Sequence, residues 1–283
     1  MTEPSLDKRR VRRFFARAAA SYDAAAVLQR EVGRRLDERL DLIRLVPKTI
    51  LDLGCGTGEQ LQSLMRRYPR ARVVALDLAL PMLQRARRRG RWLRRPACLC
   101  GDMEALPLAD RSIDLIHSNL AFQWATDPDR LFRECLRVLR PGGLLLFTTF
   151  GPDTLSELRR AWSQVDRHQH VSEFIDMHDL GDALLRAGFA DPVMDVERLV
   201  LTYAEVDDLL ADLRALGARN ATAGRPRGLA GRARLEALRR AYEGFRRRGV
   251  LPATWEVVHG HAWAPEGPLP PPRRPEVLLP KPR

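Results

Sequence analysis

Residues 49–58 constrain the fold more than any other part of the chain. The segment begins with an apolar, β-branched run, which is typical of a parallel strand buried on both faces. Asp52 stands near the end of this run, and a helix is expected over 59–67. Three glycines occupy alternate positions in between: Gly54, Gly56 and Gly58. Glycine permits sharp turns and close approach to a ligand, so the segment predicts a ligand-binding loop at a helix N-terminus.

The glycine spacing differs from that of dinucleotide-binding loops. Those loops read Gly-x-Gly-x-x-Gly, whereas this one reads Gly-x-Gly-x-Gly directly after Asp52. A carboxylate disfavours a pyrophosphate and favours a cationic or zwitterionic ligand, such as the sulfonium and ammonium groups of S-adenosylmethionine. The alternative is a plain strand-turn-helix corner without a ligand. Residues 52–58, Asp-Leu-Gly-Cys-Gly-Thr-Gly, resemble motif I of the class I S-adenosylmethionine-dependent methyltransferases.

Strands and helices alternate along the chain, which predicts an α/β fold with a doubly wound, mostly parallel sheet. The expected strands are 50–53, 72–77, 97–100, 112–119, 144–149, 193–203 and 255–263. The resemblance implies a seven-stranded, Rossmann-like sheet with N-terminal helices and a helical insert between the last two strands. The expected parts are N-terminal lid helices (1–46), a cofactor-binding core (47–203), a helical insert or lid (204–250), the last core strand (251–264) and a disordered Pro-rich tail (265–283).

Acids follow two further strands. In a βαβ unit, Asp77 lies beside the glycine loop, where its carboxylate can accept hydrogen bonds from ribose hydroxyls, and Leu78 follows it. Asp102 can accept from an exocyclic amine, and Met103 can present its backbone N–H and an apolar surface to adenine. A helix cap is the alternative for Asp77, and an ordinary turn for Asp102. The expected cofactor-binding residues are therefore Asp52, Gly54, Gly56, Gly58, Asp77, Leu78, Asp102, Met103 and Asn119.

Residues beyond the fourth strand should face the ligand crevice, because crevices of open α/β sheets lie at the carboxyl ends of strands. The catalytic candidates, none of them certain, are Tyr22, Asn119, Gln123 and Trp124. Tyr22 has a plainer interpretation as a packing aromatic at a helix junction. His117 has apolar neighbours and is interpreted as structural. His259 and His261 share a strand face without an apparent third ligand, so no metal site is expected.

The formal net charge of +12, from 48 Lys and Arg against 36 Asp and Glu, predicts affinity for acidic partners. No zinc-finger spacing or ribonucleoprotein motif indicates nucleic acid, and an acidic protein fits equally well. The four cysteines form no Cys-x-x-Cys pair. No apolar run approaches membrane-spanning length, and the N-terminus does not resemble a signal peptide. We expect a soluble, cytoplasmic monomer that contacts neither membrane nor nucleic acid.

A closer resemblance extends almost to residue 263. Several blocks resemble the malonyl-[acyl-carrier protein] O-methyltransferase family of biotin synthesis, namely 15–23, 118–124, 149–155, 174–182, 217–220 and 251–256. The resemblance implies that S-adenosylmethionine methylates the free carboxyl of a malonyl group on acyl carrier protein or on CoA. The methyl ester masks the charge, so that fatty-acid enzymes can extend the primer.

This reaction suits a site without a general base. A carboxylic acid with a pKa of about 4 is already ionised at neutral pH, so alignment and desolvation would supply the catalysis. Arg219 and Arg225 of the insert are the expected substrate-binding residues, because a guanidinium can hold a carboxylate or thioester oxygen. The basic N-terminal helix would suit an acidic carrier protein. The alternative is that these arginines are merely solvated.

Other functions stay open at this point. One is a small-molecule methyltransferase acting, for example, on a quinone precursor, which would need a base near the acceptor. Another is an assembly or modification factor with a methyltransferase-like fold. A nucleic-acid methyltransferase is a further possibility, and its only support is the net positive charge.

Overall fold

The computed structural model describes residues 6–90, 95–218 and 231–267. Within these residues a seven-stranded sheet has the order β3-β2-β1-β4-β5-β7-β6. All neighbours are parallel except β7, which is antiparallel to both β5 and β6. This confirms the expected doubly wound, mostly parallel sheet. The strands are β1 (Thr49–Leu53), β2 (Arg72–Asp77), β3 (Ala97–Cys100), β4 (Ile113–Ser118), β5 (Leu139–Phe150), β6 (Ala190–Tyr203) and β7 (Leu251–Trp263).

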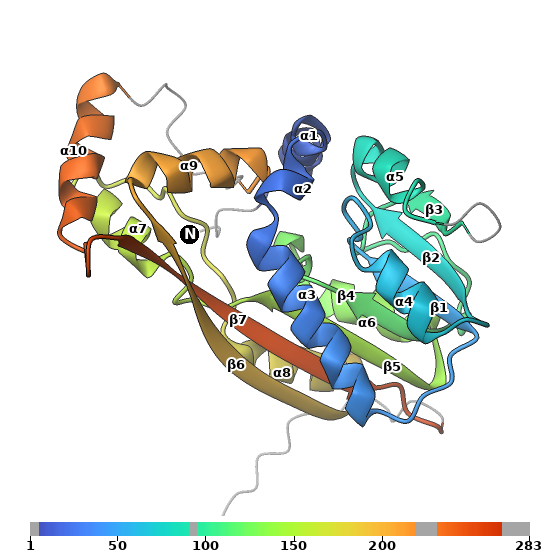
Figure 1. Cartoon of the computed structure of the whole chain (residues 1–283). Helices are drawn as coiled ribbons and strands as arrows, with labels where there is room; N and C mark the ends of the chain where they lie inside the picture. The colour runs from blue at the N-terminus through green and yellow to red at the C-terminus, as the bar shows by residue number, and fades with distance from the viewer. Residues whose placement is uncertain (1–5, 91–94, 219–230, 268–283) are drawn as a thin grey trace, which may run out of the picture.

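Helices cover both faces of the sheet, so β1 is buried from Ile50 to Leu53 (Figure 1). One face carries α3 (Val27–Arg39), α4 (Leu61–Arg67) and α5 (Leu80–Ala86). The other carries α6 (Pro128–Val138) and α8 (Met177–Ala187). The sequence marks several of these ends. Asp127 accepts a hydrogen bond from the N–H of Arg130, and Gly188 ends α8 with a positive φ of 99°.

The long strands β6 and β7 extend beyond the rest of the sheet and carry a second cluster of helices (Figure 1). These helices are α7 (Ser156–Ser163), α9 (Val206–Ala215) and α10 (Arg232–Glu243). Trp162, Leu209 and Leu238 share an apolar core with the projecting end of β7. The insert between the last two strands therefore forms α9 and α10, as the sequence predicts.

The N-terminal helices lie beside α9, although the two segments are distant in the sequence (Figure 1). They are α1 (Lys8–Ala18) and the single turn α2 (Tyr22–Ala25). The Ser21 hydroxyl donates to the carbonyl of Ala215 at 3.0 Å. A Cβ on Gly217 would lie 3.1 Å from the Phe14 carbonyl oxygen, so the backbones meet closely. Residues of both segments line one pocket together with the carboxyl ends of the central strands.

One expected helix is wrong in its extent. The sequence pattern indicates one helix over 24–45, but the chain redirects at Ala26 and η1 (Leu40–Leu42) follows α3. Asp23 accepts hydrogen bonds from Thr57 and Arg89, so the first turn follows the glycine loop rather than the axis of α3. The same pattern places Val27 on an apolar stripe with Leu28 and Val32, but Val27 is 53% exposed as a consequence of this break.

None of the helices in the described ranges is both long enough and apolar enough to cross a membrane. The expected tail lies outside the described residues from position 268 onward.

Candidate functional site

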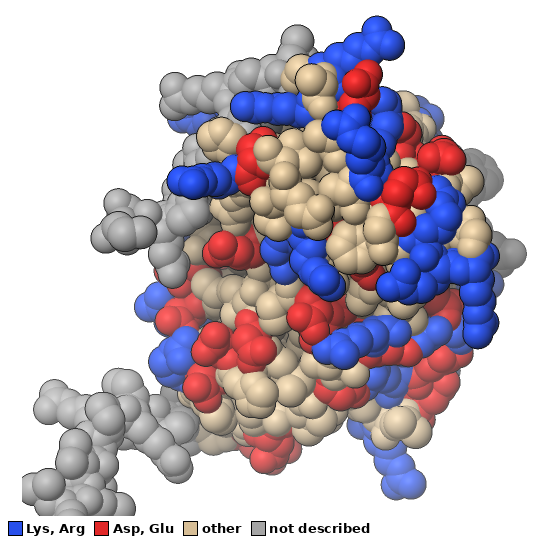
Figure 2. All heavy atoms as spheres, turned by 90° about the vertical axis from the view of Figure 1, so that its left-hand side faces the viewer, with Lys and Arg blue, Asp and Glu red and all other residues tan. Residues whose placement is uncertain are grey.

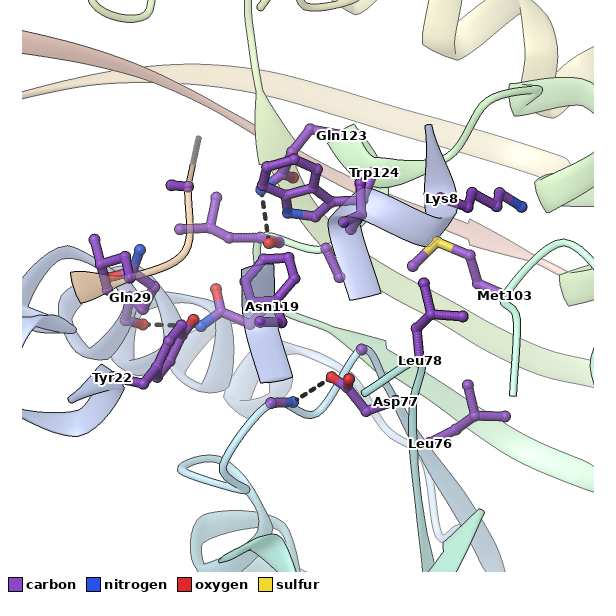
Figure 3. A pocket seen from close by; sticks show the side chains of 18 of the residues that line it. Lys8, Tyr22, Gln29, Leu76, Asp77, Leu78, Met103, Asn119, Gln123 and Trp124 are labelled. Carbon is purple, nitrogen blue, oxygen red and sulfur yellow. Dashed lines mark hydrogen bonds between the residues drawn. The ribbon is translucent and has the colours of Figure 1, made fainter. Parts of the chain in front are cut away.

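A pocket of about 850 Å³ lies at the carboxyl ends of β1, β2 and β4. Figure 3 shows Lys8, Leu78 and Met103 at one end, and Tyr22, Gln29 and Asn119 at the other. Gln123 and Trp124, from η2 (Phe122–Trp124), lie between these ends at the top of the view. Most of the residues predicted from the sequence therefore meet in one cavity: Tyr22, Gly54, Gly56, Asp77, Leu78, Asp102, Met103, Asn119, Gln123 and Trp124.

The glycine loop needs its glycines for geometry. Gly54 has φ +75°, and a Cβ there would lie only 2.3 Å from the Cβ of Ala121. Gly56 has φ +53° and exposes its backbone to the pocket. Gly58 lines no described part of the pocket, and a Cβ on it would meet Leu61 at 2.6 Å and Ala86 at 2.9 Å. In this structure Gly58 serves close packing of the loop against α5.

Asp77 is held rigidly beside this loop. One carboxylate oxygen accepts from the N–H of Ala79 at 2.7 Å, and the other accepts from the N–H of Gly56 at 2.9 Å. Asp77 therefore bonds the residue that precedes α5, which resembles the helix-cap alternative, and it also faces the loop. Its binding to the ribose stays a prediction. Burial raises the pKa of Asp77 to about 6, although the two backbone donors oppose this shift.

Asp102 has a partner that sequence reasoning missed. Lys8 reaches from α1 and donates to both carboxylate oxygens of Asp102, at 2.7 and 2.6 Å, and lies 2.5 Å from Glu104. Val11 and Phe15 line the pocket from the same helix. Val11 and Phe15 are four residues apart, so the apolar face of α1 was the available signal. The α1 helix therefore forms a wall of the pocket.

Asn119 connects the sheet to α3. Its side-chain N–H donates to the Gln29 carbonyl at 2.8 Å, and its oxygen accepts from the Thr148 hydroxyl at 2.9 Å. The pKa of the neighbouring Tyr22 is raised by burial and then by the charge of Asp77, so the phenol stays neutral. Tyr22 therefore offers a hydroxyl group and not a base.

Gln123 and Trp124 are also fixed in place. The Gln123 amide donates to the Leu120 carbonyl at 2.7 Å and accepts from Thr149 at 3.3 Å. Trp124 packs edge-on against Phe15, with ring centroids 5.2 Å apart. Further lining residues that sequence reasoning missed include Phe150 at the end of β5, and Leu216 and Ala218 in the insert.

Asp52 lies in an adjoining cavity of about 440 Å³, which it shares with Gly54, Gly56 and Asn119. One of its carboxylate oxygens is buried and has no hydrogen-bond partner. An orphaned buried carboxylate oxygen next to the glycine loop fits a ligand ammonium group, so the residues present fit S-adenosylmethionine.

The two expected substrate-binding arginines, Arg219 and Arg225, lie outside the described residues. Among the described residues that line the larger pocket, the ionisable side chains are Lys8, Tyr22, Asp77 and Asp102. Lys8 and Asp102 bind each other, and Asp77 is occupied by backbone donors. None of these groups is placed to remove a proton from an acceptor.

Comparison with known proteins agrees with this geometry. Residues 51–147 match the family described as "Methyltransferase domain". The YcgJ protein from Bacillus subtilis has the same fold, with a TM-score of 0.58 at 16% identity over 82% of this chain and 98% of its own. A S-adenosylmethionine-dependent methyltransferase from Thermotoga maritima has a TM-score of 0.53 at 17% identity, covering 90% and 99%. Fold, glycine loop and family match together define a class I S-adenosylmethionine-dependent methyltransferase.

Relatives with much higher sequence identity show which family of this class the chain belongs to. A malonyl-[acyl-carrier protein] O-methyltransferase from Laribacter hongkongensis is 56% identical over 92% of this chain and 90% of its own length. Another from a Methylovorus species is 54% identical over 92% and 90%. The chain belongs to the malonyl-[acyl-carrier protein] O-methyltransferase family.

Proposed function

We propose that this enzyme transfers a methyl group from S-adenosylmethionine to the free carboxylate of malonyl-acyl carrier protein, producing the ester that primes the pimeloyl chain of biotin. One observation carries the choice of acceptor. The described wall of the pocket holds no residue placed to act as a base. Methylation of a phenol or an ammonium group requires loss of a proton, whereas a carboxylate is already ionised.

The cofactor supplies an activated methyl group on a sulfonium. Asp77 would accept from the ribose hydroxyls, while Asp102 and Met103 would face the adenine. Asp52 would attract the ammonium group, because its free carboxylate oxygen lies next to the loop. Tyr22, Asn119 and Gln123 then remain to orient the acceptor, and Trp124 excludes water. Orientation of this kind can lower the activation free energy by about 7–11 kcal/mol.

We further propose that 1–46 and 204–250 form a cover over a core of 47–203 and 251–264. The Ser21–Ala215 hydrogen bond and the close approach at Gly217 support this division. Leu216 and Ala218 line the pocket, and Arg219 is the next residue in the chain. That position in the chain supports Arg219 as a residue that holds the malonyl thioester. The proposal for Arg225 rests on the sequence alone.

The carrier protein would dock on α1. Its exposed arginines have no ionic partner within the described ranges, and they are Arg9, Arg12, Arg13 and Arg17. By contrast, Figure 2 shows basic side chains interspersed with acidic ones on the face that lies at the left in Figure 1. An acidic partner is therefore attracted more strongly to α1. The described pocket wall comes from one chain, which supports the proposal of a monomer. We also propose a cytoplasmic location, which rests on the sequence pattern alone.

The test compares three acceptors with methyl-labelled S-adenosylmethionine: malonyl-acyl carrier protein, malonyl-CoA and a phenolic quinone precursor. We expect label on the carrier, slower labelling of the CoA ester and none on the phenol. Preferred labelling of the phenol would contradict the proposal and support the small-molecule alternative. Binding of the cofactor without labelling of any acceptor would favour a methyltransferase-like assembly factor.

The [4+2]-cyclase SpnF also has this fold, with a TM-score of 0.53 at 23% identity over 84% of this chain and 82% of its own, so the fold alone does not define a reaction.

A further inference from the structure

Three ionisable side chains meet beneath α3, where they are shielded from solvent. Asp52 of β1 and His117 of β4 stand opposite each other in the sheet register, and Asp37 of α3 covers them. His117 is fully buried, and Asp52 is 2% exposed. The pocket chemistry described above uses Asp52 but assigns nothing to His117 or Asp37.

The histidine ring is placed between two carboxylates. Its Nε2 lies 3.3 Å from an oxygen of Asp37, and its Nδ1 lies 3.7 Å from an oxygen of Asp52. A neutral imidazole has one N–H donor and one acceptor nitrogen, so it would direct a lone pair at one of the two anions. The doubly protonated ring directs a donor at each carboxylate. The geometry therefore selects the imidazolium form.

The surrounding charges agree with this assignment. Although burial lowers the pKa of His117, the neighbouring carboxylates of Asp37 and Asp52 raise it to about 9. Arg67 of α4 donates to the Asp37 backbone carbonyl at 3.0 Å and forms an ion pair with Asp41. Its positive charge is therefore partly neutralised by Asp41 and acts less on His117. Burial raises the pKa of Asp52, and His117 is the group that lowers it. Without that cation, the buried carboxyl would tend to keep its proton.

We propose that His117 is a positioning residue that keeps Asp52 ionised and directed toward the ammonium group of the cofactor. The inference rests on the proposed cofactor site. One oxygen of Asp52 faces the histidine, and the other is buried without a partner at the adjoining cavity. Asp37 is the second anchor, which fixes the ring from the side of α3. In this arrangement His117, which lies behind the glycine loop, keeps a negative charge on Asp52 at the cofactor site.

The competing interpretation is purely structural, with the histidine attaching α3 to the sheet. The two interpretations differ in whether the loss of the His117 charge weakens binding of the ligand's ammonium group in particular or of the whole ligand. The test uses His117→Gln, which keeps a hydrogen-bonding side chain but removes the charge, and measures two ligands by calorimetry. S-adenosylhomocysteine carries the α-ammonium group, and 5′-methylthioadenosine lacks the amino-acid portion. We expect His117→Gln to weaken S-adenosylhomocysteine binding about tenfold or more and to change 5′-methylthioadenosine binding less than about twofold.

His259→Gln is the matched control, because His259 is another buried histidine of the sheet, 1% exposed and outside the pocket wall. It should change the affinity for neither ligand. Equal weakening of both ligands by His117→Gln, or no weakening, would overturn the proposal. These measurements need no methyl acceptor. If the ligand difference is found but malonyl-acyl carrier protein is not methylated, the proposed reaction fails and this inference stands.

A measurement on the unmodified enzyme covers the case in which His117→Gln does not fold. Nitrogen NMR of the histidine rings reports the protonation of each ring nitrogen. We expect both nitrogens of His117 to carry protons at neutral pH and the ring to lose one near pH 9. A neutral His117 tautomer at neutral pH would refute the inference.

Discussion

The ammonium group of Lys8 lies 2.6 Å from the nearer carboxylate oxygen of Asp102. This contact joins the start of α1 to the turn after β3, so the first helix of the chain closes the end of the pocket where adenine is expected. The two side chains are 24% and 34% exposed. The ion pair is partly screened by solvent, and its contribution is of the order of 1 kcal/mol or less.

Lys8→Met should loosen this closure. We expect S-adenosylhomocysteine to dissociate a few-fold faster, up to about fivefold, because α1 opens more readily. Stopped-flow displacement measures the rate. Arg9→Met is the control, since Arg9 is exposed on the same helix and has no described partner. An unchanged or slower release from Lys8→Met would show that the contact does not close the pocket.

Gly54→Ala should abolish detectable cofactor binding. The new Cβ would stand 2.3 Å from that of Ala121, and an L-residue at φ +75° is strained by about 1–2 kcal/mol. The loop must therefore move, which disturbs the neighbouring backbone. Calorimetry with S-adenosylhomocysteine measures the loss, and thermal denaturation should show a lower Tm. Adding Ala121→Gly removes the clash but not the strain, so it should restore part of the affinity. Normal binding by Gly54→Ala alone would contradict the assigned loop geometry.

Reversing the charges of Arg9, Arg12 and Arg13 to Glu should raise KM for malonyl-acyl carrier protein at least several-fold, while KM for malonyl-CoA should change little. The reason is that the carrier is held by long-range attraction, which salt should weaken in the wild type. Arg70→Glu with Arg72→Glu is the control, because these exposed residues lie at the amino end of β2, away from the pocket. Equal responses with carrier and CoA substrates would exclude α1 as the docking helix.

Cofactor affinity should depend on pH at both ends of the range. Below about pH 6 Asp77 gains a proton and accepts ribose hydrogen bonds poorly, so affinity should fall as the pH is lowered. Above about pH 9 His117 loses its proton and Asp52 loses its cation, so affinity should fall again. Tyr22 stays neutral throughout, because burial and the charge of Asp77 raise its pKa. Calorimetry across this range should give a bell-shaped profile, and Asp77→Asn should lack its acid side. A flat wild-type profile would contradict both roles.

Much of the site was predictable because it depends on local patterns. An apolar strand followed by spaced glycines defines the loop at Gly54 and Gly56, and strand ends place Asp77 and Asp102 at the same edge. The α/β alternation likewise defined the sheet. Whether these residues bind the cofactor as proposed stays a prediction.

The parts that were not predictable come from contacts between distant segments. Nothing near Lys8 indicates that it meets Asp102, because the pairing depends on how α1 crosses the sheet edge. The break at Ala26 arises from the bonds that Thr57 and Arg89 make to Asp23. His117 has apolar neighbours in the sequence, so only the folded sheet shows that it stands between two carboxylates.

The most direct test of the central claim is the intact mass of malonyl-acyl carrier protein after incubation with the enzyme and S-adenosylmethionine. The account predicts a gain of one methyl group on the malonyl form and no gain on acetyl-acyl carrier protein, whose acyl group lacks the free carboxylate. An unchanged malonyl-carrier mass with an enzyme that binds S-adenosylhomocysteine, or equal methylation of the acetyl form, would contradict it.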